Sequence, residues 1–217
     1  MIENNVKEIL NEISIGNNLG ESITLVGATK YVPVENINIA ISAGLKDIGE
    51  NKPQEFRDKF NDVLPVNYHF FGRLQKNKVK YLIDKTCLIH SVDSISLLEE
   101  INNQSLKNQV VTNILLEINL GEEQKAGFNF EETIDLLPTI SGYNGVNLQG
   151  FMAMLPDTDD EDLKINLLDN LRNFYDKFKD KYNFKYLSVG MSGDYKLAIK
   201  HGSNMIRVGS KIFGARY

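Results

Sequence analysis

Eight short apolar runs, each followed by a stretch of mixed polarity, predict an α/β fold whose parallel sheet closes into a (β/α)8 barrel of the TIM type. The runs contain few polar residues, as expected for strands covered on both faces, and 217 residues suit one barrel. An open doubly wound sheet is the alternative, because strand counting from one sequence is imprecise. We expect a single domain over residues 1–217, since no linker, low-complexity tract or repeat interrupts the chain.

The predicted elements begin with an acidic amphipathic helix, MIENNVKEILNEI, which precedes the barrel. The predicted strands cover residues 24–30, 46–51, 68–72, 87–93, 113–120, 148–154, 186–191 and 205–214. The clearest helix follows the acidic run PDTDDED, with apolar side chains at Leu163, Leu167, Leu171, Phe174 and Phe178. Acidic residues are favoured at a helix N-terminus, so we interpret this run as a helix start rather than as a metal site.

Charge and composition limit the possible partners. The net charge of −5 and the pI near 5.3 argue against a general binder of nucleic acid or anionic membranes. No apolar run approaches the roughly 18 residues of a membrane span, and the N-terminus lacks the features of a signal peptide. We therefore expect a cytoplasmic protein. The single cysteine, Cys87, lies in an apolar run, which predicts a buried core thiol.

Two glycine–serine turns fall where a barrel carries its functional site, at the carboxyl ends of the strands. Ser192 follows the seventh predicted strand, and it is also a plausible N-cap for the helix after it. Gly209 and Ser210 lie along the eighth, where the glycine permits close approach to the backbone and the serine offers a hydroxyl. Barrels often hold phosphate groups in these two loops, so the turns predict a phosphate site.

Lys30 ends the first predicted strand. Strand alternation sends Val26, Ala28 and Lys30 to one side, so Lys30 faces the barrel mouth if Val26 faces the core. A partly desolvated lysine can form a Schiff base with an aldehyde. An imine-forming lysine opposite a phosphate site suggests pyridoxal 5′-phosphate (PLP), which carries both an aldehyde and a phosphate. Arg207 fits as the partner of the pyridine nitrogen, which a charged arginine would keep unprotonated.

Several motifs fall in one order over nearly the whole chain: LVGATKYVP, AGLKDIGENKPQEFRDK, YHFFGRLQKNKVK, HSVDS, EINLGEEQKAGF, GFMAM and LSVGMSGDYKLAIKHGSNMIRVGSKIFGARY. In these motifs the sequence resembles the YggS/PROSC-type PLP homeostasis proteins, relatives of the N-terminal barrel of alanine racemase. The resemblance implies a PLP-binding barrel with Lys30 as the Schiff-base lysine. It also implies Ser192, Gly209 and Ser210 around the phosphate, Arg207 at the pyridine nitrogen and Asn51 lining the pocket. From the residues alone, Glu50 and Asn51 could simply close a turn.

The sequence departs from the usual pattern of that family at Pro53, at Arg73, and at Ala28 and Thr29 before the lysine. None of these changes removes a proposed cofactor contact, although Arg73 can alter the pocket rim. The basic stretch Arg73–Lys85 is interpreted as a solvated helix face. The alternative is an anion- or partner-binding surface beside the pocket mouth.

The three histidines are given structural interpretations. His69 and His90 lie in apolar runs and are interpreted as core histidines, and His201 as a cation at a helix C-terminus. They show no close pairing such as H-x-x-x-H, so we expect no metal site.

Two functions fit a PLP-binding barrel. The first is a homeostasis protein or carrier that holds PLP on Lys30 and releases it to other proteins, such as PLP-dependent apoenzymes. The second is a small fold-type-III enzyme such as an amino-acid racemase, which needs acid/base groups on both faces of the substrate carbon. In alanine racemase a tyrosine from a separate domain of the partner subunit supplies one of them. The sequence ends at Tyr217, so we expect no such domain, favour the homeostasis role without catalytic residues, and expect a monomer from the resemblance.

Overall fold

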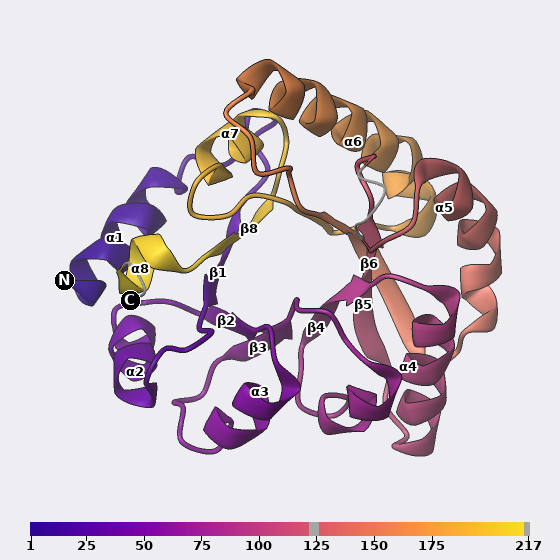
Figure 1. The fold of residues 1–217 in the computed structure, drawn as a ribbon, viewed down its shortest axis with the longest axis horizontal. Helices are drawn as coiled ribbons and strands as arrows, with labels where there is room; N and C mark the ends of the chain where they lie inside the picture. The colour runs from indigo at the N-terminus through magenta and orange to yellow at the C-terminus, as the bar shows by residue number, and fades with distance from the viewer. Residues whose placement is uncertain (122–125, 215–217) are drawn as a thin grey trace.

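The computed structural model describes residues 1–121 and 126–214, and within them eight parallel strands form a closed barrel surrounded by helices (Figure 1). The strands follow one another around the barrel in chain order, and the last pairs with the first. The predicted (β/α)8 barrel is therefore confirmed, and the open doubly wound sheet is excluded.

The strands are β1 (Thr24–Ala28), β2 (Asp47–Glu50), β3 (Asn67–Phe70), β4 (Leu88–Val92), β5 (Thr112–Ile118), β6 (Val146–Ala153), β7 (Tyr186–Ser188) and β8 (Met205–Val208). The α-helices are α1 (Ile2–Glu12), α2 (Val34–Ser42), α3 (Pro53–Lys59), α4 (Ile95–Lys107), α5 (Phe130–Leu136), α6 (Glu161–Tyr182), α7 (Tyr195–Lys200) and α8 (Ser210–Phe213). Two 3₁₀ helices are η1 (Lys76–Tyr81) and η2 (Leu137–Gly142). As expected, α1 precedes the barrel, and it packs beside α2 and α8 (Figure 1).

All eight strands end earlier than the sequence predicts, and the difference is largest for β8. β8 ends at Val208, because the chain turns at Gly209 and its carbonyl accepts hydrogen bonds from the N–H groups of Ile212 and Phe213, both at 2.9 Å. Residues 210–213 therefore form α8 rather than a strand extension. β1 ends at Ala28 and β7 at Ser188, so the residues that follow them are free to form turns at the barrel mouth.

The long helix α6 begins where the acidic run predicts it. The Asp160 side chain accepts a hydrogen bond from the Leu163 N–H at 2.9 Å, which is the geometry of an N-cap. Leu168, Leu171 and Phe174 are buried on the face toward the barrel. The interpretation of this run as a helix start is confirmed.

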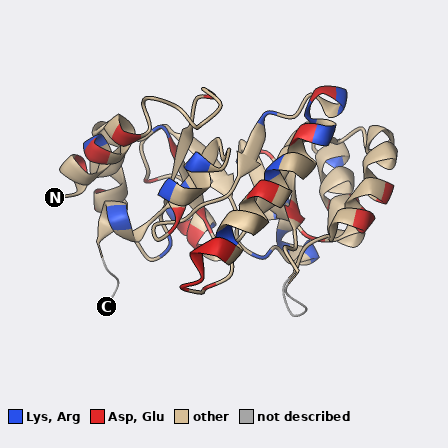
Figure 2. Cartoon of the chain, turned by 90° about the horizontal axis from the view of Figure 1, so that it is seen from above, with Lys and Arg blue, Asp and Glu red and all other residues tan. Residues whose placement is uncertain are grey.

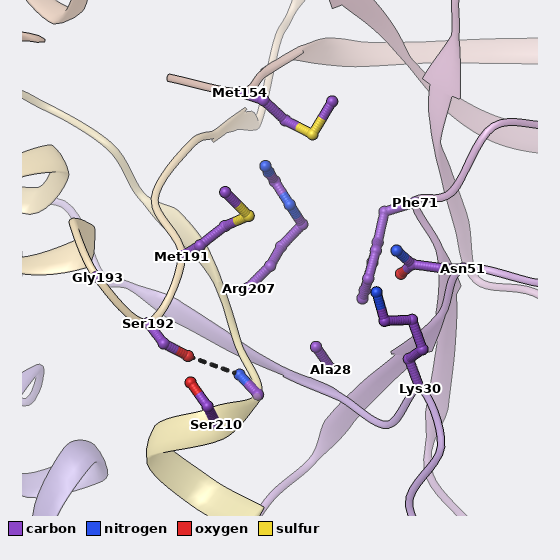
Figure 3. Close-up of a pocket in the computed structure, with 11 residues that line it drawn as sticks. Ala28, Lys30, Asn51, Phe71, Met154, Met191, Ser192, Gly193, Arg207 and Ser210 are labelled. Atoms are coloured by element: carbon purple, nitrogen blue, oxygen red, sulfur yellow. Dashed lines mark hydrogen bonds between the residues drawn. The ribbon is translucent and has the colours of Figure 1, made fainter. Parts of the chain in front are cut away.

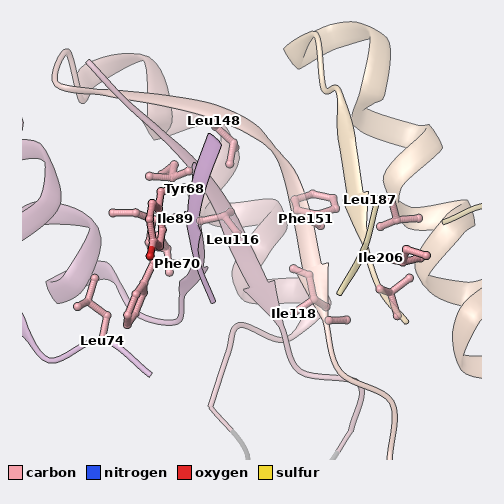
Figure 4. Close-up of a cluster of buried hydrophobic side chains, with 14 of the residues drawn as sticks. Tyr68, Phe70, Leu74, Ile89, Leu116, Ile118, Leu148, Phe151, Leu187 and Ile206 are labelled. Carbon is pink, nitrogen blue, oxygen red and sulfur yellow. The ribbon is translucent and has the colours of Figure 1, made fainter. Parts of the chain in front are cut away.

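The apolar core has two parts. The larger part lies between the strands and the helices and includes Phe70, Leu116, Phe151 and Leu187 (Figure 4). The smaller part comprises Val26, Leu88, Leu115, Met152 and Met205. Strand alternation directs these side chains to the barrel interior. Because Val26 points inward, the prediction that Ala28 and Lys30 face the mouth follows from the register of β1.

Both signs of charge are distributed over the outer helices and loops (Figure 2). None of the helices in the described part of the chain combines the length and apolar character needed to cross a membrane.

Candidate cofactor-binding site

A pocket of about 510 Å³ opens at the carboxyl ends of the strands, and its volume lies within the roughly 300–1,000 Å³ usual for small-molecule sites. All six predicted site residues line it: Lys30, Asn51, Ser192, Arg207, Gly209 and Ser210. The lining also includes residues not selected from the sequence: Ala28, Phe71, Met154, Met191 and Gly193. Lys30 and Asn51 lie on one side, the two serines lie on the other, and Arg207 lies between them (Figure 3).

Lys30 lies in the turn after β1, with its amine beside Asn51 (Figure 3). The next residue, Tyr31, has φ of 61°, a left-handed value that is uncommon for a residue with a side chain. Two contacts hold this conformation: the Tyr31 N–H donates to Glu55 Oε2 at 2.7 Å, and Lys52 Nζ donates to the Tyr31 hydroxyl at 2.6 Å. The neighbouring helix α3 and its N-terminal residue Lys52 thus fix the direction of the Lys30 turn.

A fully buried carboxylate, Glu50, supports the same turn from behind. Its Oε1 accepts from the Thr29 hydroxyl at 2.7 Å and from Lys59 Nζ at 2.8 Å, while Lys59 also donates to the Thr29 carbonyl at 2.8 Å. Its Oε2 has no hydrogen-bond partner among the described residues. Burial raises the pKa of Glu50, and the Lys59 ammonium offsets this only in part.

Sequence reasoning treated Glu50 as a turn residue and missed this cluster. The available signal was a charged residue that ends an apolar strand run, followed by Glu55 and Lys59 at helical spacing.

Asn51 presents an unsatisfied acceptor to the pocket. Its Oδ1 is buried and has no partner within the described residues. The backbone of Gly72 packs closely against the backbone of Asn51. A Cβ added at Gly72 would lie 2.1 Å from the Asn51 backbone carbonyl oxygen, so glycine is required at that position. Buried polar atoms are normally paired, so Asn51 Oδ1 marks a position where a bound donor would be stabilised.

The opposite wall is built from the turns after β7 and β8. Ser192 Oγ accepts a hydrogen bond from the Gly209 N–H at 3.1 Å, which joins the two turns (Figure 3). A Cβ added at Gly193 would meet no atom within 4 Å, so the wall is open at that point. Hydroxyls, glycine backbone and open space together form a cradle that suits a phosphate group.

Ser192 is not the N-cap of the following helix, contrary to the sequence interpretation. α7 begins at Tyr195, and Asp194 holds the cap position. The Tyr195 N–H donates to the Met191 carbonyl at 2.8 Å, so residues 191–194 form a turn before the helix. This turn directs the Ser192 hydroxyl to Gly209 instead of to the helix.

Arg207 lies deep in the pocket and is only 4% exposed. Its Nη1 donates to the Ser188 carbonyl at 2.8 Å and to Ser188 Oγ at 2.6 Å, and its Nη2 donates to the Ala153 carbonyl at 3.0 Å. Burial lowers the pKa of Arg207 to about 10, against the opposing effects of Glu117 and Asp194. The guanidinium is therefore charged at neutral pH and is held by neutral acceptors.

The remaining sequence interpretations concern residues outside the pocket lining. His69 and His90 are buried and hydrogen-bonded to each other, which confirms them as core histidines. His201 follows the last residue of α7, as expected, and contacts Asp169 at 2.7 Å. Cys87 is only partly buried rather than fully buried, and burial raises the pKa of its thiol to about 12.

The basic stretch Arg73–Lys85 contains the short 3₁₀ helix η1, and Lys76 and Lys80 on it are exposed, as the interpretation of a solvated helix face expects. Arg73, Lys76 and Lys78 line a second pocket, which also includes Asn51 and so adjoins the first. A role in binding anions or partners stays a prediction. Across residues 1–121 and 126–214, no cluster of three or more His, Cys, Asp or Glu side chains could hold a metal ion.

Comparisons with known proteins agree with the barrel fold. Residues 33–217 match the family model described as alanine racemase, N-terminal domain. The pyridoxal phosphate homeostasis protein of Aquifex aeolicus (strain VF5) is 39% identical over 197 residues, covering 88% of this chain and 86% of that protein. The structure of PipY from Synechococcus elongatus PCC7942 with PLP bound has a TM-score of 0.87 at 27% identity, covering 99% of this chain and 100% of that chain.

A more distant structure has the same barrel. Alanine racemase from Clostridium difficile 630, in complex with cycloserine, has a TM-score of 0.79 at 16% identity, covering 98% of this chain and 58% of that one. At this identity the similarity concerns the fold alone. The family model and the 39% identical relative confirm the resemblance found in the sequence motifs. The chain therefore belongs to the family of pyridoxal phosphate homeostasis proteins, whose barrel is that of the alanine racemase N-terminal domain.

Proposed function

We propose that this protein holds PLP reversibly on Lys30 and serves PLP homeostasis, releasing the cofactor to PLP-dependent apoenzymes. One observation carries the proposal: the Lys30 amine faces a hydroxyl and glycine cradle across a single pocket, with the charged Arg207 between them (Figure 3). PLP carries an aldehyde, a phosphate-bearing group and a ring nitrogen at three separate positions of one ring, and the amine, the cradle and the guanidinium offer one contact for each. PipY, a relative with 27% identity, has been solved with PLP bound.

The proposed attachment is an imine. Lys30 Nζ adds to the aldehyde carbon, a C=N bond replaces the C=O bond, and the aldehyde oxygen leaves as water. No oxidant or reductant takes part, and the addition of water reverses the step. When bound, PLP supplies an aldehyde and an electron-accepting ring. Reversible attachment suits a protein that must both hold and release the cofactor.

The other contacts divide between the two ends of the ligand. Ser192, Gly209 and Ser210 hold the phosphate through hydroxyl and backbone groups. Arg207 contacts the ring nitrogen and keeps it unprotonated, because the guanidinium is itself a charged donor. Asn51 Oδ1, which is buried without a partner among the described residues, accepts from a ligand donor or a bound water.

The composition of the lining favours holding the cofactor over turning over an amino acid. Lys30 and Arg207 are its ionisable side chains within the described residues. A racemase needs a second acid/base group on the opposite face of the substrate carbon, and such a group is typically worth about 10²–10⁴ in rate. We therefore propose that the chain has no strong catalytic activity of its own.

Borohydride reduction of the PLP-loaded protein, followed by peptide mass mapping, tests the attachment. We expect the pyridoxyl mass on Lys30 and its loss in Lys30→Ala. Lys76→Ala is the matched control, because Lys76 lines the adjoining pocket at the same barrel mouth. A pyridoxyl mass only on another lysine would overturn the assignment of Lys30.

Incubation of the loaded protein with L-alanine, and separately with D-alanine, in deuterated water tests the functional class. The homeostasis role predicts no conversion faster than with free PLP. Steady formation of the opposite enantiomer that is lost in Lys30→Ala would favour a racemase.

A further inference from the structure

A chain of buried polar side chains crosses the barrel interior next to Arg207. Arg207 Nη1 donates to Ser188 Oγ at 2.6 Å, and this oxygen lies 3.1 Å from Nδ1 of His90. Nε2 of His90 lies 2.9 Å from Nδ1 of His69, whose Nε2 lies 3.0 Å from Oδ1 of Asp47. The residues come from β8, β7, β4, β3 and β2, so the chain joins strands on opposite sides of the barrel. It connects the cofactor pocket with a separate cavity at the amino ends of the strands, which Asp47 and His69 line. This cavity is distinct from the one lined by Arg73, Lys76 and Lys78.

The middle of this chain is shielded from water. His90 and Ser188 are 0% exposed and His69 is 3% exposed, whereas the Asp47 side chain at the far end is 17% exposed. Burial lowers the pKa of His90 well below its ordinary value, and the nearby His69 and Arg207 act in the same direction. His90 is therefore neutral and carries one ring proton.

The two ends of the chain fix the direction of its hydrogen bonds. A guanidinium can only donate, and a carboxylate can only accept. Because Ser188 Oγ accepts from Arg207, the Ser188 hydroxyl proton is directed to Nδ1 of His90. His90 must then donate from Nε2 to His69, and His69 must donate from Nε2 to Asp47. Every donor points away from Arg207.

The reverse order is unfavourable. If His90 donated from Nδ1, the Ser188 hydroxyl proton would be buried without an acceptor among the described residues. An unsatisfied buried donor disfavours that arrangement by about 5- to 150-fold. The geometry therefore selects one tautomer for each histidine.

We infer that Ser188, His90 and His69 are positioning residues that hold Arg207 in place for the ring nitrogen of PLP. The inference rests on the proposed function, since it takes Arg207 as the ring-nitrogen contact. Ser188 fixes Nη1 and the Ala153 carbonyl fixes Nη2, which leaves Nε–H and one Nη2–H without a partner in the described part of the chain. Because the fixed acceptors are neutral, the guanidinium keeps its charge for the ligand.

The histidine tautomers are measurable without the cofactor. In PLP-free protein labelled with ¹⁵N-histidine, long-range ¹H–¹⁵N spectra near pH 8 should show His90 and His69 protonated at Nε2 only. The protein contains three histidines, so single substitutions assign the spectrum. His201 lies outside the buried chain of polar side chains and serves as the reference. A proton on Nδ1 of His90 would overturn the proposed direction of the hydrogen bonds from Arg207 to Asp47.

The positioning of Arg207 is tested with Ser188→Ala. We expect loss of the slowly exchanging Arg207 side-chain N–H signals in PLP-free protein, and faster PLP dissociation by about 10- to 100-fold in loaded protein. Ser203→Ala is the matched control, because Ser203 is equally buried but its hydroxyl contacts the Leu187, Val189 and Met205 carbonyls and not Arg207 within the described residues. Ser188→Thr keeps the hydroxyl and should restore the Arg207 signals.

The outcomes separate this inference from the proposed function. Unchanged Arg207 signals in Ser188→Ala would overturn the positioning role whether or not PLP binds. Intact tautomers and Arg207 signals in a protein that fails to bind PLP would overturn the proposed function and leave the buried chain as a structural feature only. Equal acceleration of dissociation in Ser188→Ala and Ser203→Ala would also refute the specific role of Ser188.

Discussion

Two carboxylates at opposite ends of the barrel, the partly buried Glu21 and the fully buried Glu50, differ in how completely their oxygens are hydrogen-bonded. Glu21 precedes β1 at the amino end, where Arg172 Nη1 donates to it at 2.7 Å and Lys179 also donates to it. Burial raises the pKa of Glu21, but these hydrogen bonds overcome that effect and lower it to about 2. Glu50 ends β2 at the carboxyl end, where one of its oxygens lacks a partner within the described residues and burial raises its pKa.

The difference indicates that the carboxylate at the amino end of the barrel contributes to stability, whereas the carboxylate at the carboxyl end supports the site. A fully paired carboxylate such as Glu21 stabilises the folded state at neutral pH. A partly paired one such as Glu50 carries a desolvation cost, and it lies directly behind the turn that presents Lys30. The amino end of a barrel generally serves stability and the carboxyl end serves the site, and these two carboxylates follow that division.

The largest expected effect is on the Glu21 cluster. Arg172→Met removes the guanidinium partner of Glu21 but leaves Lys179, so it should lower the free energy of unfolding by about 1.5–3 kcal/mol. Arg57→Met is the control, because Arg57 pairs with Asp58 on the surface and an exposed pair is worth about 1 kcal/mol or less. Urea unfolding at neutral pH measures both. Equal losses in the two variants would mean that the Glu21 cluster is no more important than a surface pair.

The two carboxylates should respond to pH with opposite signs. The pKa of Glu21 falls from 4.5 to about 2 on folding, so its stabilising contribution is present above pH 4.5 and is lost as the pH falls toward 2. The pKa of Glu50 rises on folding, so its contribution is lost as the pH rises above 4.5.

Unfolding of Glu21→Gln and Glu50→Gln between about pH 3 and pH 8 separates the two contributions. The cost of Glu21→Gln should grow as the pH rises to 4.5 and then level off. Glu50→Gln should become steadily more favourable relative to the parent above that pH. Parallel curves for the two variants would contradict the comparison.

A smaller effect should appear at the cofactor site. Glu50→Gln weakens the contacts of Thr29 and Lys59 that hold the Lys30 turn, so imine formation with PLP should slow by about 3- to 10-fold. Glu21→Gln should leave that rate unchanged, because it lies at the other end of the barrel. Stopped-flow absorbance after mixing with PLP measures the rate, and an equal change in both variants would point to general loosening of the fold.

The smallest effect concerns two left-handed residues. Tyr31 follows Lys30 with φ of 61°, and Asn183 ends α6 with φ of 53°. Glycine relieves this conformation, so Tyr31→Gly should gain up to about 1 kcal/mol of stability, less the loss of the Lys52 contact. Asn183→Gly should gain a few tenths at most, because asparagine tolerates this region. Thermal unfolding measures both gains. A larger gain in stability for Asn183→Gly than for Tyr31→Gly would contradict the expectation that the backbone strain is greater at Tyr31.

The fold and six of the eleven residues that line the pocket were predicted from the sequence, and most of them for one reason. A parallel barrel places the carboxyl ends of all strands at one mouth, so a residue such as Lys30 or Ser210 can be located from its position after a strand. Contacts across the barrel interior leave no such periodic signal. His90 and Ser188 are 98 residues apart, and neither the chain that includes them nor the support of Glu50 by Lys59 was predicted.

The errors at the strand ends have a related cause. Apolar runs predict where a strand can continue, but a single turn decides where it stops. The hydrogen bonds to the Gly209 carbonyl begin α8. The turn after β7 moves Ser192 away from its predicted cap position and joins it to Gly209. Both depend on the backbone geometry of two neighbouring turns. Composition and spacing do not encode that geometry.

The pairing of β1 with β8 has a consequence for how the site comes into existence during synthesis. Thr24 through Gly27 align with Met205 through Val208, so the first and last strands of the barrel are neighbours. A nascent chain exposes Lys30 early but has no phosphate cradle until the segment with Ser210 emerges. Under the proposed function, PLP held at both Lys30 and the cradle with Ser210 would therefore stabilise only chains that have already closed the ring. Retention of PLP, rather than imine formation alone, would thus report on completed folding.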